Sequence, residues 1–469
     1  MKHYKKIWQT GHYDDQLCFL TMVKILYLTA YLSKHHYFSL NHLPMQYFMR
    51  VIFILFLYLP YFIFSQNETD YNITINTGEA WDANIFYKKT GTPLRPVIIL
   101  NSSGEELFHE VWPMQGNDFK INDNNKITFY DLETDGWMVM DSLHNIVDSV
   151  YCLNGYVADP HDFIALENGH YIMFAYDQQP YAMDTIVEGG DPEAIVEGLI
   201  IQELDADHNL VFEWKSWDHY HITDNQYLPL NFPVLNFIHA NAIDVDNDGH
   251  ILLSSRNLDE ITKINRTTGE IIWRWGGTQS DITFVNDYPF TYQHSISSLG
   301  DNRYLLFDNG NYSSIYTGVE NVSRAVEYEL DTVDMTATKV WEFVHPDSLY
   351  CPTQGSVQRL PNGNTLIDFG NLSLFNIGAI VTEVKPDNEI VFQLEYDFGI
   401  SLYRVKKFDW FFYEPEMVSI KENNSLDLPP TRNIVKIFNL FGQEVIPSYG
   451  QIAIYTYDDG SVEKRLVLE

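Results

Sequence analysis

Three histidines and one arginine, in four short blocks, are the residues of this chain whose types and spacing could do chemistry. The blocks are Pro160-His161-Asp162, His239-Ala240-Asn241, Ser254-Ser255-Arg256 and Gln293-His294-Ser295. Each histidine ends a connecting stretch and precedes a strand-like run. No cysteine or paired-carboxylate pattern accompanies them, so the blocks do not resemble a zinc site. Gathered in one place, they would form a basic pocket that suits an anion.

A repeated unit of four strands is the element that must position these blocks. Asn168-Gly169, Asp248-Gly249 and Asn362-Gly363 lie between apolar runs, which is the pattern of a hairpin turn. Units close on a strand with an aromatic residue, such as Trp214 or Trp275. Repeats of about 40 to 60 residues with four strands each are typical of propeller blades. We therefore expect an all-β fold, a β-propeller of about six four-stranded blades followed by a small C-terminal β-module. The tryptophans should pack between blades.

Composition limits the classes of function. The chain has 469 residues, 29 Lys and Arg against 64 Asp and Glu, and a formal net charge of -35. Because no basic face is visible, we expect no nucleic-acid partner. The acidic balance favours solubility and contrasts with the basic pocket. The sequence leaves open whether Cys152 and Cys351 are bridged or free.

The N-terminal region has the pattern of a secretion signal. Met49-Arg50 precedes the apolar run 51–64, and Ser65-Gln66 follows. This run is shorter than the ~20 residues that a spanning helix needs. We expect residues 49–65 to be a signal peptide, and residues 1–48 to be a mis-annotated upstream extension. An internal membrane anchor is the alternative.

The C-terminal region changes character after the propeller domain, which we expect to span residues 66–418. Asn and Pro residues mark residues 419–432 as a linker. Residues 433–469 resemble the C-terminal sorting domain of type IX secretion cargo, on the turn 440–445 and the terminal strand 460–466. The resemblance implies that the type IX machinery is a partner, and that the protein is exported through the periplasm to be secreted or held at the cell surface. An ordinary small β-module is the alternative.

From about Trp81 to Trp410 the chain resembles the bacterial arylsulfotransferase family. The matching segments, in chain order, are Pro160–Phe163, Leu166–Tyr171, His239–Asp244, Leu253–Arg256, Thr268–Gly277, Tyr292–Ser295, Leu306–Gly310 and Ser401–Val405. The family is a propeller that moves a sulfuryl group from an aryl sulfate to a phenol. It needs no nucleotide donor, and a histidine becomes transiently sulfated. The resemblance implies small aryl sulfate and phenol substrates, and no cofactor or metal.

The resemblance also assigns roles to the four blocks. His294 would be the nucleophile, whereas His239, Asn241 and Arg256 would hold the sulfuryl oxygens. His161 would protonate the leaving phenoxide or deprotonate the acceptor. These roles fit the chemistry, because sulfuryl transfer resembles phosphoryl transfer and depends on positioning and electrostatic stabilisation. Arginine offers a fork of donors, and a neutral imidazole is a competent nucleophile.

Two other functions remain open. A non-catalytic, exported propeller could use the same rim to bind a sulfated or carboxylated ligand, and a metal-dependent hydrolase is a third possibility. The N-terminal β-domain found in some family members is short here, which leaves the oligomeric state open. An acidic insert, residues 181–198, follows the His161 strand, and we expect it to line the mouth of the pocket and shape the choice of acceptor.

Overall fold

The computed structural model describes residues 69–92, 95–111, 115–410, 434–438, 452–457 and 462–466. The chain divides into two compact units, residues 1–413 and 414–469. The predicted upstream extension, signal peptide and linker lie outside the described residues, so these domain boundaries stay predictions. Among the described residues, no helix is both long and apolar enough to cross a membrane.

The first unit is a six-bladed β-propeller, as the repeated unit predicts. The strands of each blade are given from the inner to the outer one. Blade 1 contains β27 (Ser401–Phe408), β2 (Asn84–Thr90), β3 (Val97–Leu100) and β4 (Glu106–Glu110), and blade 2 contains β5 (Gln115–Ile121), β6 (Ile127–Asp131), β7 (Gly136–Met140) and β8 (Ile146–Val150). Blade 3 contains β9 (Ala158–Ala165), β10 (Tyr171–Tyr181), β11 (Ala194–Leu204) and β12 (Leu210–Lys215).

Blades 4 to 6 have the same order. Blade 4 contains β14 (Ala240–Val245), β15 (Ile251–Ser255), β16 (Glu260–Ile264) and β17 (Ile271–Gly276). Blade 5 contains β19 (His294–Gly300), β20 (Arg303–Asp308), β21 (Arg324–Asp331) and β22 (Thr336–Val344). Blade 6 contains β23 (Ser356–Arg359), β24 (Thr365–Phe369), β25 (Ile380–Val384) and β26 (Ile390–Tyr396). Short elements complete the unit: β1 (Tyr71–Asn76), β13 (Val234–Asn236), β18 (Thr283–Phe284), α3 (Ser313–Thr317) and the 3-10 turns η2 (Met183–Thr185), η3 (Ser216–Asp218), η4 (Ile222–Asp224), η5 (Arg256–Leu258) and η6 (Ser373–Phe375).

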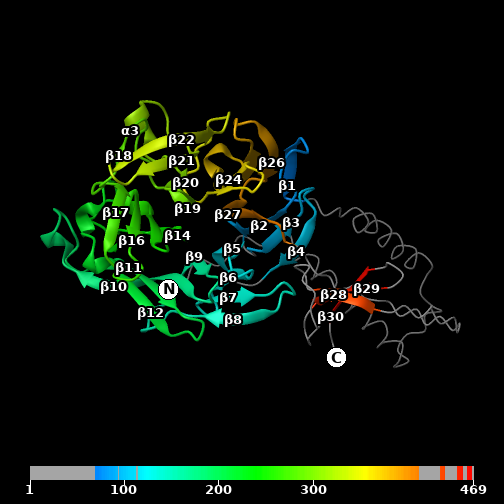
Figure 1. The fold of residues 1–469 in the computed structure, drawn as a ribbon. Coiled ribbons are helices and arrows are strands. Elements are labelled where there is room, and N and C mark those ends of the chain that lie inside the picture. Colours follow the sequence, from blue (N-terminus) through cyan, green and yellow to red (C-terminus); the bar gives the residue numbers. More distant parts are fainter. Residues whose placement is uncertain are drawn as a thin grey trace, which may run out of the picture. The chain divides into compact units, whose positions relative to one another are not determined.

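The inner strands form a closed ring around the axis. In order, β27, β5, β9, β14, β19 and β23 each contact the next, and β23 contacts β27 again. Figure 1 shows β5, β9, β14, β19 and β27 facing the middle of the ring. The N-terminal and C-terminal strands of the unit both help to close the ring. The late strand β27 is the inner strand of blade 1, and the early strand β1 pairs with β26 at the outer edge of blade 6.

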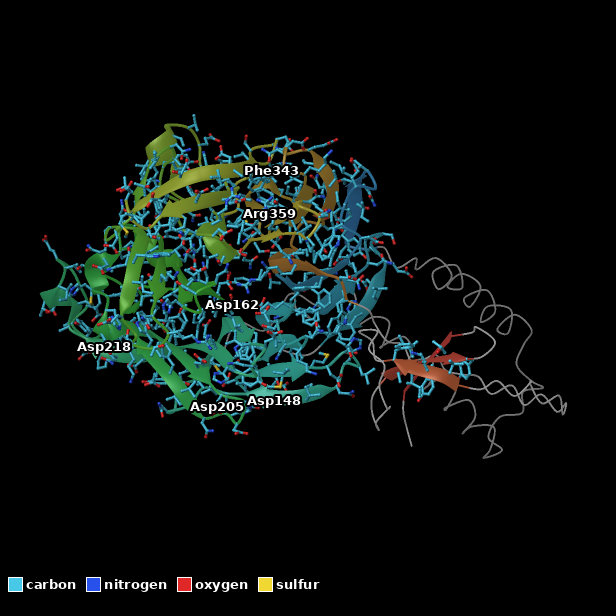
Figure 2. The ribbon with its side chains drawn as sticks, viewed as in Figure 1. Asp148, Asp162, Asp205, Asp218, Phe343 and Arg359 are labelled. Atoms are coloured by element: carbon cyan, nitrogen blue, oxygen red, sulfur yellow. The ribbon has the colours of Figure 1, made fainter. Side chains whose placement is uncertain are left out.

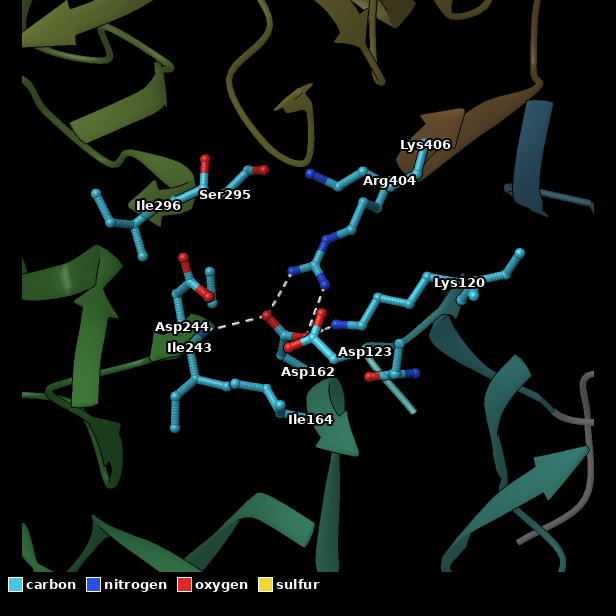
Figure 3. Close-up of a pocket in the computed structure, with 14 residues that line it drawn as sticks. Lys120, Asp123, Asp162, Ile164, Ile243, Asp244, Ser295, Ile296, Arg404 and Lys406 are labelled. Carbon is cyan, nitrogen blue, oxygen red and sulfur yellow. Dashed lines mark hydrogen bonds and ion pairs between the residues drawn. The ribbon is translucent and has the colours of Figure 1, made fainter. Parts of the chain in front are cut away.

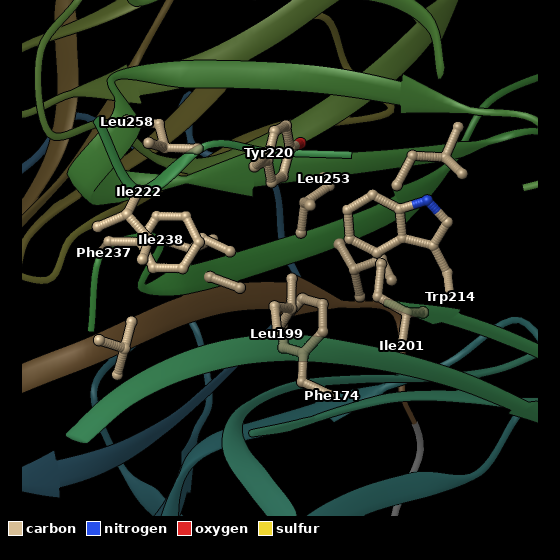
Figure 4. Close-up of a cluster of buried hydrophobic side chains, with 14 of the residues drawn as sticks. Phe174, Leu199, Ile201, Trp214, Tyr220, Ile222, Phe237, Ile238, Leu253 and Leu258 are labelled. Atoms are coloured by element: carbon tan, nitrogen blue, oxygen red, sulfur yellow. The ribbon is translucent and has the colours of Figure 1, made fainter. Parts of the chain in front are cut away.

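The predicted hairpin turns and inter-blade tryptophans are confirmed. Gly169 and Gly249 both have φ of 84°, the left-handed region that such turns need. Trp214 of blade 3 is buried with Leu253 of blade 4 (Figure 4), and its indole Nε1 donates to the carbonyl of Gly269 at 3.0 Å. The ring of Trp275 meets two rings edge-on, that of Phe290 just before β19 at 4.9 Å and that of Tyr328 on β21 at 5.0 Å. Aromatic pairs of this geometry add about 0.5–1.5 kcal/mol each to the gain from burial.

Hydrogen bonds between neighbouring inner strands fix their relative positions. Asp162 on β9 accepts a hydrogen bond from the amide of Ile243 on β14 at 3.0 Å. Asp244 on β14 accepts one from the amide of Ser298 on β19 at 2.8 Å. These bonds join the three strands on or beside which the three histidines lie.

The second unit contains an antiparallel sheet, β28 (Ile434–Phe438), β29 (Ile452–Tyr457) and β30 (Val462–Leu466), in that order. Ala453, Tyr455 and Tyr457 are buried in it. The expectation of a small C-terminal β-module is therefore confirmed, whereas the turn 440–445 lies outside the described residues.

In the first unit, Cys152 and Cys351 are both free thiols, which settles the alternative that the sequence left open.

Candidate active site

The structure brings the three histidines together at one end of the inner strands. His161 lies on β9, His239 directly precedes β14, and His294 begins β19. The ring centroids of His161 and His239 are 5.0 Å apart. The Tyr403 ring of β27 lies 5.5 Å from His161 and 6.1 Å from His294, so it packs between them.

The His294 imidazole is held in one tautomer. Its Nδ1 lies 2.7 Å from Asn309 Oδ1 and 3.1 Å from the carbonyl oxygen of Tyr292. Because both partners are acceptors, Nδ1 carries the hydrogen, and in the neutral ring Nε2 keeps its lone pair. Burial and the nearby Arg256 guanidinium lower the pKa of His294 to about 3. The ring is therefore neutral near physiological pH.

The orientation of Asn309 is itself fixed. Its Nδ2 donates to the carbonyl oxygens of Cys351 and Gln354, both at 2.8 Å. Both amide hydrogens are thus used on carbonyls, and the amide oxygen must face His294. Backbone strain accompanies this arrangement, because Tyr292 and Ser295 on either side of His294 both have φ of 58°. Left-handed conformations of such residues cost about 1–3 kcal/mol each and concentrate at functional sites.

The His161 imidazole has a different partner. Its Nδ1 lies 2.7 Å from Asp159 Oδ1, which also accepts the backbone amide of His161 at 2.9 Å. Burial alone would lower the pKa of His161, but the Asp159 carboxylate outweighs it, and the pKa is raised above its usual value. His161 is therefore suited to carry a proton into the pocket.

His239 and Arg256 are joined through the backbone. The carbonyl oxygen of His239 accepts the amide of Arg256 at 3.0 Å, and His239 adopts a left-handed conformation with φ of 48°. Burial and the neighbouring charges of His161 and Arg256 hold the pKa of His239 well below its usual range. The His239 ring is thus neutral, and it lies beside two groups that can be positively charged, His161 and Arg256.

The Arg256 guanidinium makes no ion pair with a carboxylate in the described part of the chain, although the charge of the nearby Asp259 acts on it. It lies over the Tyr292 ring, 4.0 Å from the centroid, and donates to Asn257 Oδ1 at 3.0 Å and to the carbonyl of Pro352 at 3.5 Å. Within the described part of the chain, none of its ion pairs or hydrogen bonds involves Asp or Glu. Its charge lowers the pKa of both His239 and His294, so it lies close to both rings. An anion beside these rings would meet a fork of donors that is not already held by a carboxylate among the described residues.

Asn241 lies in the wall behind the pocket. Its side chain is fully buried, and its Nδ2 donates to the carbonyl of Gln293 at 2.7 Å. Tyr403 and Arg404 both donate to the carbonyl of Asn241, at 2.9 and 3.2 Å. Asn241 therefore fixes the peptide that precedes His294, and its predicted contact with sulfuryl oxygens stays a prediction.

A layer of buried charges forms the floor of the site. Arg404 pairs with Asp118 at 3.0 Å and with Asp162 at 2.8 Å, and Lys120 pairs with Asp118 at 2.9 Å and with Asp162 at 2.5 Å. Figure 2 shows Asp162 near the middle of the ring of blades. Beyond this layer, further along the inner strands, is a cavity of about 170 Å³ that Asp244 and other strand residues line (Figure 3).

Sequence reasoning missed Asp159, Asn309 and the packing role of Tyr403. Asp159 stands two residues before His161, and Asn309 and Tyr403 both lie in segments that carry the family resemblance. The acidic insert continues the β10–β11 hairpin, and its influence on acceptor choice stays a prediction. Among the described residues, no group of three or more His, Cys, Asp or Glu side chains could hold a metal ion.

Residues 97–404 match a family model described as Arylsulfotransferase (ASST). The chain belongs to the arylsulfotransferase family. Family membership implies aryl sulfotransferase activity, with small aryl sulfates and phenols as substrates. No curated protein matches the chain.

Several solved structures are similar to this arylsulfotransferase at low identity. A Bacteroides caccae protein of unknown function is 12% identical, with a TM-score of 0.44, over 70% of this chain and 99% of that one. A virginiamycin B lyase from Staphylococcus aureus is 11% identical, with a TM-score of 0.37, over 85% and 99%. A periplasmic gluconolactonase from Pseudomonas aeruginosa is 10% identical, with a TM-score of 0.39, over 70% and 99%.

Proposed function

We propose that this arylsulfotransferase moves a sulfuryl group from an aryl sulfate to a phenol in two steps, through a covalent intermediate on His294. The observation that carries the proposal is the His294 ring, neutral and with Nδ1 fixed by Asn309 at 2.7 Å, beside an Arg256 that the described carboxylates leave unpaired. A nucleophile and an anion site thus meet in one buried place.

In the first step, His294 Nε2 attacks sulfur while the bond from sulfur to the aryl oxygen breaks. The electron pair of that bond passes to the aryl oxygen, which takes a proton from His161 and leaves as a phenol. The sulfuryl group is then bonded to Nε2, and Nδ1 keeps its hydrogen bond to Asn309.

In the second step, the acceptor phenol gives its proton to the now neutral His161 as its oxygen attacks sulfur. The N–S bond breaks, its electron pair returns to Nε2, and both histidines regain their starting states. The three outer sulfuryl oxygens keep their charge throughout, so Arg256 and His239 stabilise the moving group by position and charge. The nucleophile splits one difficult transfer into two easier ones.

We also propose that the protein is exported. Residues 49–65 support a signal peptide by their basic start and short apolar run, and residues 433–469 support a type IX sorting domain by their sequence marks. On this proposal the mature chain begins at Gln66, the propeller domain ends at about residue 418, and the secretion machinery is a partner.

Release of p-nitrophenol from p-nitrophenyl sulfate tests the proposed function. We expect the purified protein to release p-nitrophenol much faster with added phenol, and to form phenyl sulfate in equal amount. Varying donor and acceptor together should give parallel double-reciprocal lines, the pattern of a ping-pong reaction. Release that yields inorganic sulfate regardless of acceptor would instead identify a hydrolase. No release from several aryl sulfates that nevertheless bind would identify a non-catalytic binding propeller.

A further inference from the structure

Two of the pocket histidines have the same hydrogen-bond geometry but chemically different partners. His161 Nδ1 lies 2.7 Å from Asp159 Oδ1, and His294 Nδ1 lies 2.7 Å from Asn309 Oδ1. Aspartate and asparagine have nearly the same shape, yet only aspartate carries a charge. The pocket therefore contains a matched pair of imidazoles that differ in the charge behind the ring.

We propose that Asp159 and Asn309 are positioning residues that divide the work between the two histidines. Asp159 keeps the proton on His161, so that His161 is the acid of the first step. Asn309 fixes the tautomer of His294 without adding charge, so that Nε2 stays an unprotonated nucleophile. The inference rests on the proposed function and deepens it, because it explains which histidine takes which role.

Two carboxylates raise the pKa of His161, and Asp159 acts on it more strongly than Asp162 does. Asp162 also lies nearby, but Lys120 and Arg404 pair with it at 2.5 and 2.8 Å. The remaining neighbours are cationic or neutral, namely Arg404 from β27, the Tyr403 ring and the His239 ring. Asp159 offers a direct bond to Nδ1, so its negative charge stabilises the protonated ring.

The surroundings of His294 favour the neutral ring. Both partners of Nδ1 are neutral acceptors, the Asn309 amide oxygen and the Tyr292 carbonyl. Arg256 and His161 both lower the pKa of His294. Its other titratable neighbours are the Tyr403 ring and the His239 ring, and neither is an anion. A carboxylate in place of Asn309 would reverse this balance, because it would stabilise the protonated ring.

Exchanging the two partners tests the inference, through the pH dependence of donor kcat/KM, which reports the protonation states of the free enzyme. In the wild type we expect activity to fall at high pH as His161 loses its proton, and at low pH only as the pH approaches the His294 pKa of about 3. Asp159→Asn removes the charge that raises the His161 pKa, so the alkaline limb should move at least ~1 pH unit lower. Asn309→Asp should move the acid limb at least ~1 pH unit higher.

Leaving groups provide a second readout. Phenolate is a much stronger base than p-nitrophenolate and needs a proton more, so Asp159→Asn should slow phenyl sulfate by ~10²-fold and p-nitrophenyl sulfate by less than ~10-fold. Asp159→Glu should restore part of the loss. Asp205→Asn and Asn265→Asp are matched controls in hairpin turns, and Figure 2 shows Asp205 at the perimeter. Both limbs should stay in place in these controls.

Diethyl pyrocarbonate reacts with an imidazole ring only when the ring is neutral, and this separates the inference from the proposed function. Mapping the modified His161 peptide against pH needs no turnover, and the Asp159→Asn variant should react at lower pH than the wild type. The inference would be overturned if the limbs of the pH profile did not move, activity fell equally at every pH and the modification profile were unchanged. Asp159 would then be a structural residue. A protein that transfers no sulfuryl group but shows the shifted modification profile would fail only the proposed function.

Discussion

Replacing His294 with alanine should abolish acceptor-dependent release of p-nitrophenol, by ~10⁴-fold or more in kcat, the scale seen when a covalent nucleophile is removed. No other pocket ring combines its properties. His161 has a raised pKa and an anionic partner, whereas the nitrogens of His239 lack a comparable fixed acceptor in the described hydrogen bonds. Steady-state kinetics with p-nitrophenyl sulfate and phenol would measure the loss.

A matched histidine controls for general effects of the substitution. His208 pairs with Asp148 in a turn region far along blade 3 from the pocket, and its side chain is 34% exposed. His208→Ala should keep wild-type kinetics, and both variants should keep the wild-type unfolding transition. A folded His294→Ala protein with more than ~10% of wild-type kcat would show that the covalent route is wrong.

Replacing Arg256 with lysine should lower kcat by ~10²-fold or more, the scale seen when one stabilising donor of a developing charge is lost. Lysine keeps the positive charge but loses the planar fork that can meet two sulfuryl oxygens together. It also loses the stacking of the guanidinium on Tyr292, which holds the side chain in place at 4.0 Å. Initial-rate kinetics over a range of donor concentrations would separate kcat from KM.

Arg303→Lys is the corresponding control. The Arg303 side chain is 45% exposed and pairs with Glu327 at 3.0 Å on blade 5. Surface ion pairs of this kind contribute little to stability, so the kinetics of the Arg303→Lys variant should equal those of the wild type. An Arg256→Lys variant with raised KM but unchanged kcat would mean that Arg256 binds the donor without favouring the transition state.

The propeller was predictable because its signals are local. Asn-Gly and Asp-Gly turns such as Asp248-Gly249 fall between strands that pair within one blade, and closing residues such as Trp214 lie where adjacent blades meet. The closure of the ring was not predictable in the same way. Thr90 on β2 pairs with Ser401 on β27, from the far end of the unit, and such distant pairing leaves no periodic trace in the sequence.

The residue types of the site were predictable from the sequence, but the directions in which their side chains point were not. The three histidines could be chosen because they fall at matching places in the repeat, on or beside inner strands. Arg256 could be chosen because its chemistry suits an anion and its segment carries the family resemblance. The partner of each ring depends on loops that approach only in the folded chain, as Asn309 on blade 5 does for His294. Asn241 shows the same limit, because it lies beside the histidines while its amide turns toward the Gln293 carbonyl.

The central claim, a sulfuryl group carried by His294, is tested most directly by mass spectrometry of the protein after brief exposure to p-nitrophenyl sulfate without acceptor. The account predicts that the peptide containing His294 gains the mass of one SO3 group, and that added phenol removes it as fast as the enzyme turns over. Transfer at the normal rate with an unmodified His294 peptide, or with the added mass on another residue, would contradict it.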